Sequence, residues 1–207
     1  MRRLLTDVRD ALRGRPVHTV RALWLTLLCV CLTAALHAWQ TSGPAGLRAV
    51  SWLGGVEAGQ AWWAALLRTP LSLFVPAPNL PVWGALAQVL VVFGAAELTL
   101  GRRWLLLLAY VGTLAGTGYA RLGVALGFEP SAVATERDTG PSAAVVALAL
   151  ALAWRYRAYA LGTVLCAVTL TEALVVGNLA SKEHVTALAV TVILCALFLR
   201  PLPRGSE

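Results

Sequence analysis

Charged residues are scarce in this sequence, and lysine is almost absent. Asp, Glu, Lys and Arg make up 13% of the 207 residues, whereas soluble domains have roughly 25%. Lys182 is the single lysine. Apolar residues account for 58% of the chain, so too few polar side chains remain to cover a soluble globule of this length. The shortage excludes a soluble enzyme, a disordered segment and a secreted disulfide scaffold, and it predicts an integral membrane protein.

A basic patch and a metal-binding cysteine pattern are also missing. The net charge is +7, but the arginines are scattered between apolar runs, and nucleic-acid binding needs positive charge gathered on one face. Cys29 and Cys31 are two residues apart, so on a helix they point to nearly opposite sides and cannot bind one metal ion. Cys166 and Cys195 lie inside apolar runs, where a thiol behaves as a small apolar group. We expect no nucleic-acid partner, disulfide, metal or cofactor.

Long apolar segments are present instead. About 20 mostly apolar residues cross the hydrocarbon core of a bilayer. The apolar segments of this length predict an all-α polytopic membrane protein. Its expected parts are a basic arm at 1–19, a six-span domain at 20–199 and a short tail at 200–207. The six candidate spans are residues 20–39, 82–100, 104–122, 141–154, 158–176 and 184–199.

Most of the cationic residues fall on one side of these six spans. Cytoplasmic loops carry an excess of Lys and Arg, so both termini are predicted to be cytoplasmic. If the first span were instead a cleaved signal peptide, five spans would remain and the new amino terminus would lie outside. Twelve of the 17 Lys and Arg residues lie on the predicted cytoplasmic side, namely Arg2, Arg3, Arg9, Arg13, Arg15, Arg21, Arg102, Arg103, Arg155, Arg157, Arg200 and Arg204.

The first loop, residues 40–79, is long for a connection between two spans. It is too apolar for a solvated loop, and prolines break it too often for another full span. We expect it to lie in the membrane interface, partly buried against the helices. Its large apolar residues and its interrupting prolines are Trp52, Trp62, Trp63, Leu71, Leu73, Phe74, Pro70, Pro76 and Pro78.

Ser142 lies where the chain enters the fourth predicted span from outside. Thr139 or Asp138 is expected to cap the helix. The first turn of a helix has unpaired N–H groups that stabilise negative charge, and the backbone at Gly140 and Ala143 is a candidate for this role. A serine at such a place is suited to nucleophilic attack, because an oxyanion can form beside those groups. The alternative is a serine that is simply solvated at a helix start.

His184 opens the sixth predicted span on the same membrane side, so we expect it at a similar depth to Ser142. A serine nucleophile needs a base within hydrogen-bond reach, and histidine is the usual one. The alternative is a histidine tolerated at the end of a span. Glu172, in the outer half of the fifth span, is expected to pair with Lys182, to bond to a neighbouring helix, or to form a polar site with His184.

Two further features of the predicted spans indicate packing. Glu97 lies close to the cytoplasmic end of the second span, where Arg102 or Arg103 is expected to neutralise it. Gly112-x-x-x-Gly116 in the third span has the spacing that lets helices approach closely.

Together these residues resemble the rhomboid family of intramembrane serine proteases. The matching features are six spans with both ends inside, a membrane-dipping first loop, Glu97-Leu-Thr-Leu-Gly101 closing the second span, Gly140-Pro-Ser142-Ala143 opening the fourth, and His184 opening the sixth. The resemblance covers residues 20–199. It implies a dyad in which Ser142 is the nucleophile and His184 the base, and which cleaves peptide bonds at the membrane.

The sequence departs from the family's pattern in several places. The family's Gly-x-Ser-Gly motif has Ala143 at its last position. Ala187 fits the small residue that follows the base, but Thr191 replaces a glycine one turn further on. Rhomboid proteases carry a His and an Asn that stabilise the oxyanion from the second span, and counting back from Glu97 gives Pro81 and Ala85. Neither side chain donates a hydrogen bond.

Three functional hypotheses follow. The first is an intramembrane serine protease, and the second is a rhomboid-like pseudoprotease that binds the transmembrane helices of clients without cleaving them. The third is a six-span channel or carrier in which Glu172 and His184 form a polar site. The expected partners are membrane lipids and single-span clients or substrates. The rarity of Lys and Ile, beside abundant Ala, Arg, Leu and Val, is typical of a GC-rich bacterial genome and suggests a bacterial plasma membrane.

Overall fold

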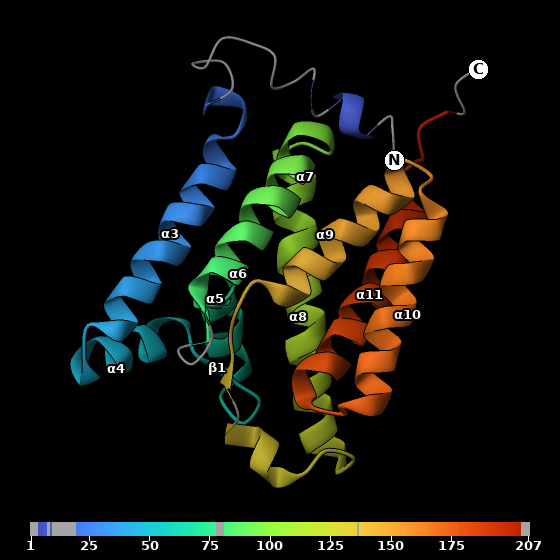
Figure 1. Cartoon of the computed structure of the whole chain (residues 1–207). Helices are drawn as coiled ribbons and strands as arrows, with labels where there is room; N and C mark the ends of the chain where they lie inside the picture. The colour runs from blue at the N-terminus through green and yellow to red at the C-terminus, as the bar shows by residue number, and fades with distance from the viewer. Residues whose placement is uncertain (1–3, 8, 10–19, 78–80, 136, 204–207) are drawn as a thin grey trace.

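The computed structural model describes residues 4–7, 9, 20–77, 81–135 and 137–203, and helices form nearly all of it (Figure 1). The long helices run up and down beside one another. The second of them, Val82–Thr99, is made of α6 (Val82–Gln88), the π-helical segment η1 (Val89–Phe93) and α7 (Gly94–Thr99). The others are α3 (Trp24–Thr41), α8 (Arg102–Leu126), α9 (Ser142–Arg155), α10 (Tyr159–Val175) and α11 (Leu179–Phe198).

Among the described residues, four helices are long and apolar enough to cross a membrane, namely α3, Val82–Thr99, α8 and α11. The prediction of a helical membrane protein is therefore confirmed at this level. The helices α9 and α10 are apolar but shorter, with 14 and 17 residues. Six helices lie near the six predicted segments, while the number that cross the bilayer stays a prediction.

The last helix begins earlier than predicted. α11 begins at Leu179 because the Asn178 side chain accepts a hydrogen bond from Ser181 N, at 2.9 Å, which satisfies one of the free N–H groups of a helix start. His184 therefore lies in the second turn of α11, and the expectation that it opens the helix is wrong. α8 is also longer than predicted and ends at Gly127, whose left-handed backbone (φ 78°) is a common helix end.

The first loop contains two short helices, α4 (Pro44–Gly54) and α5 (Trp62–Ser72), separated by the strand β1 (Val56–Glu57). β1 pairs in antiparallel register with β2 (Arg137–Asp138), the segment that leads toward α9. The first loop is therefore attached to the chain that approaches Ser142, an interaction over about 80 residues that no local pattern signals. Asn79, at the predicted end of the loop, lies outside the described residues.

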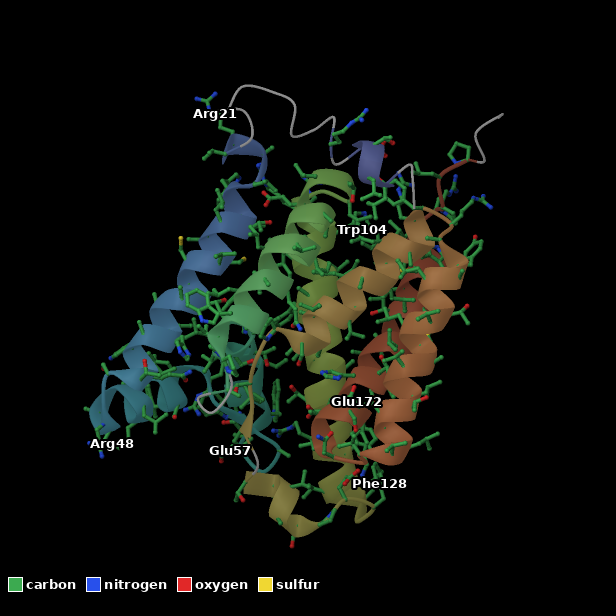
Figure 2. All side chains as sticks on the ribbon, viewed as in Figure 1. Arg21, Arg48, Glu57, Trp104, Phe128 and Glu172 are labelled. Atoms are coloured by element: carbon green, nitrogen blue, oxygen red, sulfur yellow. The ribbon has the colours of Figure 1, made fainter. Side chains whose placement is uncertain are left out.

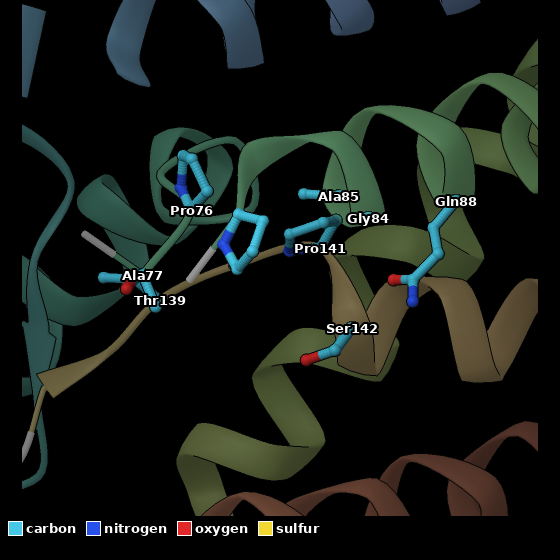
Figure 3. Close-up of a pocket in the computed structure, with 10 residues that line it drawn as sticks. Pro76, Ala77, Gly84, Ala85, Gln88, Thr139, Pro141 and Ser142 are labelled. Carbon is cyan, nitrogen blue, oxygen red and sulfur yellow. The ribbon is translucent and has the colours of Figure 1, made fainter. Parts of the chain in front are cut away.

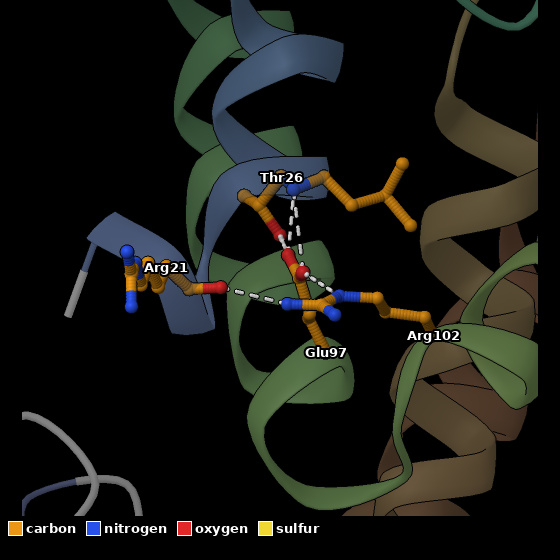
Figure 4. Close-up of polar contacts among 5 residues, drawn as sticks. Arg21, Thr26, Glu97 and Arg102 are labelled. Atoms are coloured by element: carbon orange, nitrogen blue, oxygen red, sulfur yellow. Dashed lines mark hydrogen bonds and ion pairs between the residues drawn. The ribbon is translucent and has the colours of Figure 1, made fainter. Parts of the chain in front are cut away.

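Glu97 fixes the start of α3 (Figure 4). Its buried carboxylate accepts hydrogen bonds from Thr26 N at 2.7 Å, from Thr26 Oγ1 at 2.8 Å and from Leu25 N at 3.3 Å. Arg102 Nε lies 2.9 Å from Glu97 Oε1, so the predicted ion pair is confirmed with Arg102. A carboxylate at a helix N-terminus satisfies free N–H groups and interacts favourably with the helix dipole. Glu97 therefore caps α3 from another helix, since no residue of α3 does so.

The described arginines of the predicted cytoplasmic side gather at one end of the molecule. Arg102 Nη2 donates to Arg21 O at 2.7 Å, and Arg157 Nε donates to Leu202 O at 2.7 Å. Arg155 Nη1 donates to Arg200 O. Figure 2 shows Arg21 and Trp104 at this end, and Arg48, Glu57 and Phe128 at the other. Arg2, Arg3, Arg13, Arg15 and Arg204 lie outside the described residues.

The helix α9 lies in the centre of the bundle, where it packs against α8, α11 and η1. Close contact with α8 depends on glycine, because a Cβ at Gly112 would lie 2.7 Å from Ala147 Cβ. One turn further along α8, a Cβ at Gly116 would lie 3.0 Å from Glu183 Cβ of α11. The predicted close approach at this glycine pair is thus confirmed, and it involves two different neighbours.

Candidate functional site

Ser142 is the first residue of α9, and Pro141 is the N-cap. The N-cap position is thus occupied by Pro141, and not by Thr139 or Asp138 as expected. A turn at Gly140 directs the chain into the helix instead, with a φ of 118° that favours glycine. Gly140 N donates to Ser72 O at 2.9 Å, which attaches this turn to α5.

This arrangement decides which backbone groups remain available near Ser142. The N–H of Gly140 is already bonded, so the structure corrects its assignment as an oxyanion donor. In the described part of the chain, no hydrogen bond occupies the N–H groups of Ser142, Ala143 and Ala144, as is usual for the first turn of a helix. Ala143 therefore stays a candidate donor, with Ser142 and Ala144 beside it.

Ser142 is half-buried and lines a pocket of about 410 Å³ between α6 and the segment that enters α9 (Figure 3). Pro81 and Ala85 also line the pocket. The two positions at which the rhomboid resemblance would place side-chain donors therefore line the same pocket as Ser142, and both are apolar. The complete lining is Pro76, Ala77, Pro81, Gly84, Ala85, Gln88, Thr139, Gly140, Pro141 and Ser142.

Gln88 is a pocket residue that the sequence analysis missed. It is an amide in an otherwise apolar helix, at the last position of α6, and its side chain is exposed. In Figure 3 the side chain points from α6 toward the start of α9. Pro81, Gly84, Ala85 and Gln88 follow the spacing i, i+3, i+4, i+7, which places them on one helix face. That spacing, with one polar member, is a signal from which Gln88 could have been found.

His184 and Ser142 lie at similar depths. Gly112 of α8 approaches the backbone of Ala143, and Gly116, one turn away, approaches Glu183. Ser142 is next to Ala143 in the chain, and His184 is next to Glu183. The two candidate residues therefore lie within about one helical turn of each other along α8. No hydrogen bond joins Ser142 to His184 in the described structure.

The polar neighbour of His184 is Glu172. His184 Nδ1 lies 4.0 Å from Glu172 Oε2, and the two side chains are 15% and 46% exposed. The pair joins α10 to α11, and Glu172 lies in the half of the bundle away from Arg21 (Figure 2). This contact is the polar site on which the channel or carrier hypothesis depends. It also places a carboxylate beside the imidazole, as one of the three alternatives for Glu172 predicted.

Lys182 does not pair with Glu172, so this alternative for Glu172 is wrong. Lys182 Nζ lies 2.6 Å from Glu129 Oε1, and Tyr119 Oη donates to the same oxygen at 2.7 Å. Hydrogen bonds from the Lys182 ammonium and from the Tyr119 hydroxyl hold the pKa of Glu129 below its ordinary value of 4.5. Within the described ranges, no group of three or more His, Cys, Asp or Glu residues is arranged to hold a metal ion.

Comparison with known proteins adds no relative. No protein-family model, no curated protein and no solved structure matches this chain. The resemblance to rhomboid proteases therefore depends on the residues and their positions alone.

Proposed function

We propose that this chain is a rhomboid-like integral membrane protein that binds a transmembrane segment of a single-span client at the Ser142 pocket and cleaves it as a serine protease. The position of Ser142 carries the proposal. It is the first residue of α9, beside N–H groups without acceptors, in a pocket of about 410 Å³. A hydroxyl, free N–H donors and space for a ligand are what acyl transfer requires.

The short central helix explains how Ser142 would reach a membrane segment. With 14 residues, α9 is about 21 Å long, whereas the hydrocarbon core is about 30 Å thick. If the cytoplasmic end of α9 lies at the membrane surface, its other end lies about 9 Å below the opposite surface. The pocket would then open at a depth where the end of a client's transmembrane helix is accessible.

The proposed reaction is an acyl transfer through an ester. Ser142 Oγ attacks the carbonyl carbon of the client, and its proton passes to His184. The charge that forms on the carbonyl oxygen is stabilised by the N–H groups at the start of α9. The C–N bond then breaks, and His184 returns the proton to the leaving amine. Water attacks the ester, with His184 as the base again, and this step releases the acid and restores Ser142.

Glu172 supports the orientation of the base. Because Nδ1 of His184 faces Glu172, the other ring nitrogen is the one left for the serine. A carboxylate near one imidazole nitrogen holds the ring and stabilises the imidazolium that forms during attack.

A pseudoprotease is the second candidate, and a separate observation favours it. Ser142 and His184 have no hydrogen bond to each other, and the side chains of Pro81 and Ala85 cannot donate to an oxyanion. A chain of this kind would bind the same client segment in the pocket and leave it intact. Its partners would be the same, so only a chemical test separates the two.

Labelling of the purified protein with a fluorophosphonate provides that test. We expect a covalent adduct that Ser142→Ala abolishes and His184→Ala slows by a factor of at least 10². Ser131→Ala is the matched control, because Ser131 is an exposed serine outside the pocket. Absence of a Ser142-dependent adduct, with no cleavage of any transmembrane substrate, would overturn the protease. Equal crosslinking of clients to the wild type and to Ser142→Ala would then support the pseudoprotease.

A further inference from the structure

Gln88 is an unusual residue for its position in the molecule. It lies within Val82–Thr99, one of the helices apolar enough to cross a membrane. Its side chain is exposed and has no hydrogen bond to any other described residue. An amide facing hydrocarbon without a partner costs several kcal/mol, so such a group is expected to face a polar cavity or a polar ligand. Here it faces the pocket that contains Ser142.

The neighbours of Gln88 leave space beside it. A Cβ at Gly84 would meet no atom within 4 Å, so the pocket is open at that position. Ala85 adds only a methyl group on the same helix face. Thr139 and Ser142 are the other polar side chains in the lining, and both belong to the segment across the pocket from α6. The open space is thus bounded by an amide on one side and by the start of α9 on the other.

We propose that Gln88 binds one peptide unit of an extended client segment next to Ser142. A carboxamide has one carbonyl acceptor and two N–H donors, so it can accept from a peptide N–H and donate to a peptide C=O. A helical segment has already used these groups internally. The pocket therefore selects a stretch of client backbone that is not helical, and Gln88 pairs with it. This inference depends on the proposed function, since it assumes that the pocket holds a client, and it applies whether or not the client is cleaved.

The η1 segment gives an independent reason to look at this position. Regular α-helix ends at Gln88, and the π-helical turn runs from Val89 to Phe93. A π-helical turn adds a residue to the helix, so the residues before it are rotated relative to those after it. Such turns are rare in proteins, and those that do occur are often found at functional sites. In this chain Gln88 lies before the π-helical turn, and Glu97, which caps α3, lies after it. The turn therefore changes the direction of the Gln88 side chain relative to that of Glu97.

The test measures binding of a peptide whose backbone is altered one unit at a time. The probe is a fluorescent synthetic peptide with a Leu-rich membrane anchor of about 20 residues and a flanking Ala-Ser segment. Each amide of the flanking segment is replaced in turn by an ester, which removes one N–H. Affinity is measured in detergent micelles on the full chain carrying Ser142→Ala, so that cleavage does not interfere. Gln88→Leu is compared with that background, and Thr163→Val is the matched control, because Thr163 is an exposed polar residue of α10 outside the pocket.

We expect one ester position to weaken binding by roughly 3- to 10-fold, the effect of one hydrogen bond. In Gln88→Leu the amide peptide should bind at least as weakly as this ester does to the background, because both hydrogen bonds of the side chain are lost, and the ester should cause no further loss. A residue that acts only on folding would weaken every peptide equally. Gly84→Leu should block the peptide without a clash, because the space beside Gly84 is open.

The outcomes separate this inference from the proposed function. The peptide could bind, and Gln88→Leu could have the same affinity as the Ser142→Ala background for the amide peptide and for every ester. In that case the role of Gln88 is wrong, and the Ser142 pocket is still the proposed binding site. The inference is also wrong if Gln88→Leu weakens all peptides by one common factor. If Gly84→Leu does not affect binding, the pocket is not the binding site, and the proposed function and the role of Gln88 both fail.

Discussion

The polar residues of this apolar chain divide into two groups by their partners. Glu97 is bonded to α3 and Arg102, and Glu129 is bonded to Lys182 and Tyr119. These groups stabilise the fold, since a buried charge is tolerated when it is paired and hydrogen-bonded. Gln88 and Ser142 have no hydrogen-bond partner in the described structure, and both line the same pocket. The contrast distinguishes residues that hold helices together from residues that are available to a ligand.

A prediction at this scale concerns Glu129, whose folded pKa lies below 4.5. The carboxylate is bound more favourably in the folded than in the unfolded chain, so its contribution is complete above the ordinary pKa and is lost as pH falls through the lower folded value. We expect Glu129→Gln to lower the free energy of unfolding by about 2 kcal/mol at pH 7, as for a hydrogen bond to a charged group. The difference from wild type should shrink in acid below pH 4.5.

Thermal unfolding in micelles between pH 3 and pH 7 measures this difference. Glu57→Gln is the matched control, because the Glu57 carboxylate accepts no hydrogen bond from any described residue. A destabilisation by Glu129→Gln that stays constant across the whole pH range would contradict the role of the ionised carboxylate.

At the scale of the helices, the arrangement around α8 decides where the candidate residues lie. Its glycines Gly112 and Gly116 admit α9 and α11 at successive turns, and these are the helices that carry Ser142 and His184. Side chains at Gly112 and Gly116 would separate the three helices. The glycine pair is therefore part of the geometry of the site, although neither residue lines the Ser142 pocket.

We predict that Gly112→Ala destabilises the protein by about 1–3 kcal/mol, as is usual for overpacking in a core. The new Cβ would lie 2.7 Å from Ala147 Cβ, and both belong to helix backbones that cannot move independently. Gly118→Ala, in the same helix, adds a Cβ that meets nothing within 4 Å, so it should be neutral or stabilising by up to about 1 kcal/mol. Unfolding in mixed micelles, followed by circular dichroism, compares the two variants. Equal stabilities would show that α8 does not approach α9 as closely as described.

The helices could largely be predicted from the sequence, whereas the contacts that build the site could not. The apolar runs place α9 and α10 to within a residue or two of the observed helices, because a run of apolar residues is a local property. The cap by Asn178 was not predicted, because the apolar run that marks the sixth span begins only after the polar residues Ser181, Lys182 and Glu183. The β1–β2 pair, the Gly140–Ser72 bond and the π-helical turn depend on partners distant in the chain or on packing.

The same distinction applies to individual residues. The pair of Glu97 and Arg102 was predictable because the two lie five residues apart across one turn. The partner of Lys182 was not, because Glu129 is 53 residues away in the chain, whereas the contact of His184 with Glu172 was one of the alternatives expected for Glu172. Gln88 was not predicted for another reason, since its uncharged amide stands alone in an apolar helix and belongs to no catalytic motif.

For the whole molecule, the charge distribution predicts the orientation. Arg21, Arg102, Arg103, Arg155, Arg157 and Arg200 belong to helix ends and connections on one side of the bundle. If this side is cytoplasmic and all six helices cross the bilayer, single cysteines in a chain freed of its four native ones should react with a membrane-impermeant maleimide in a fixed pattern. Ser131→Cys and Ala180→Cys should be labelled in intact cells, and Arg103→Cys and Tyr159→Cys only after permeabilisation. Labelling of Tyr159→Cys in intact cells would mean that neither α9 nor α10 crosses the bilayer. The protein would then have four membrane spans. The reverse pattern at all four positions would place the pocket on the cytoplasmic side and contradict the orientation altogether.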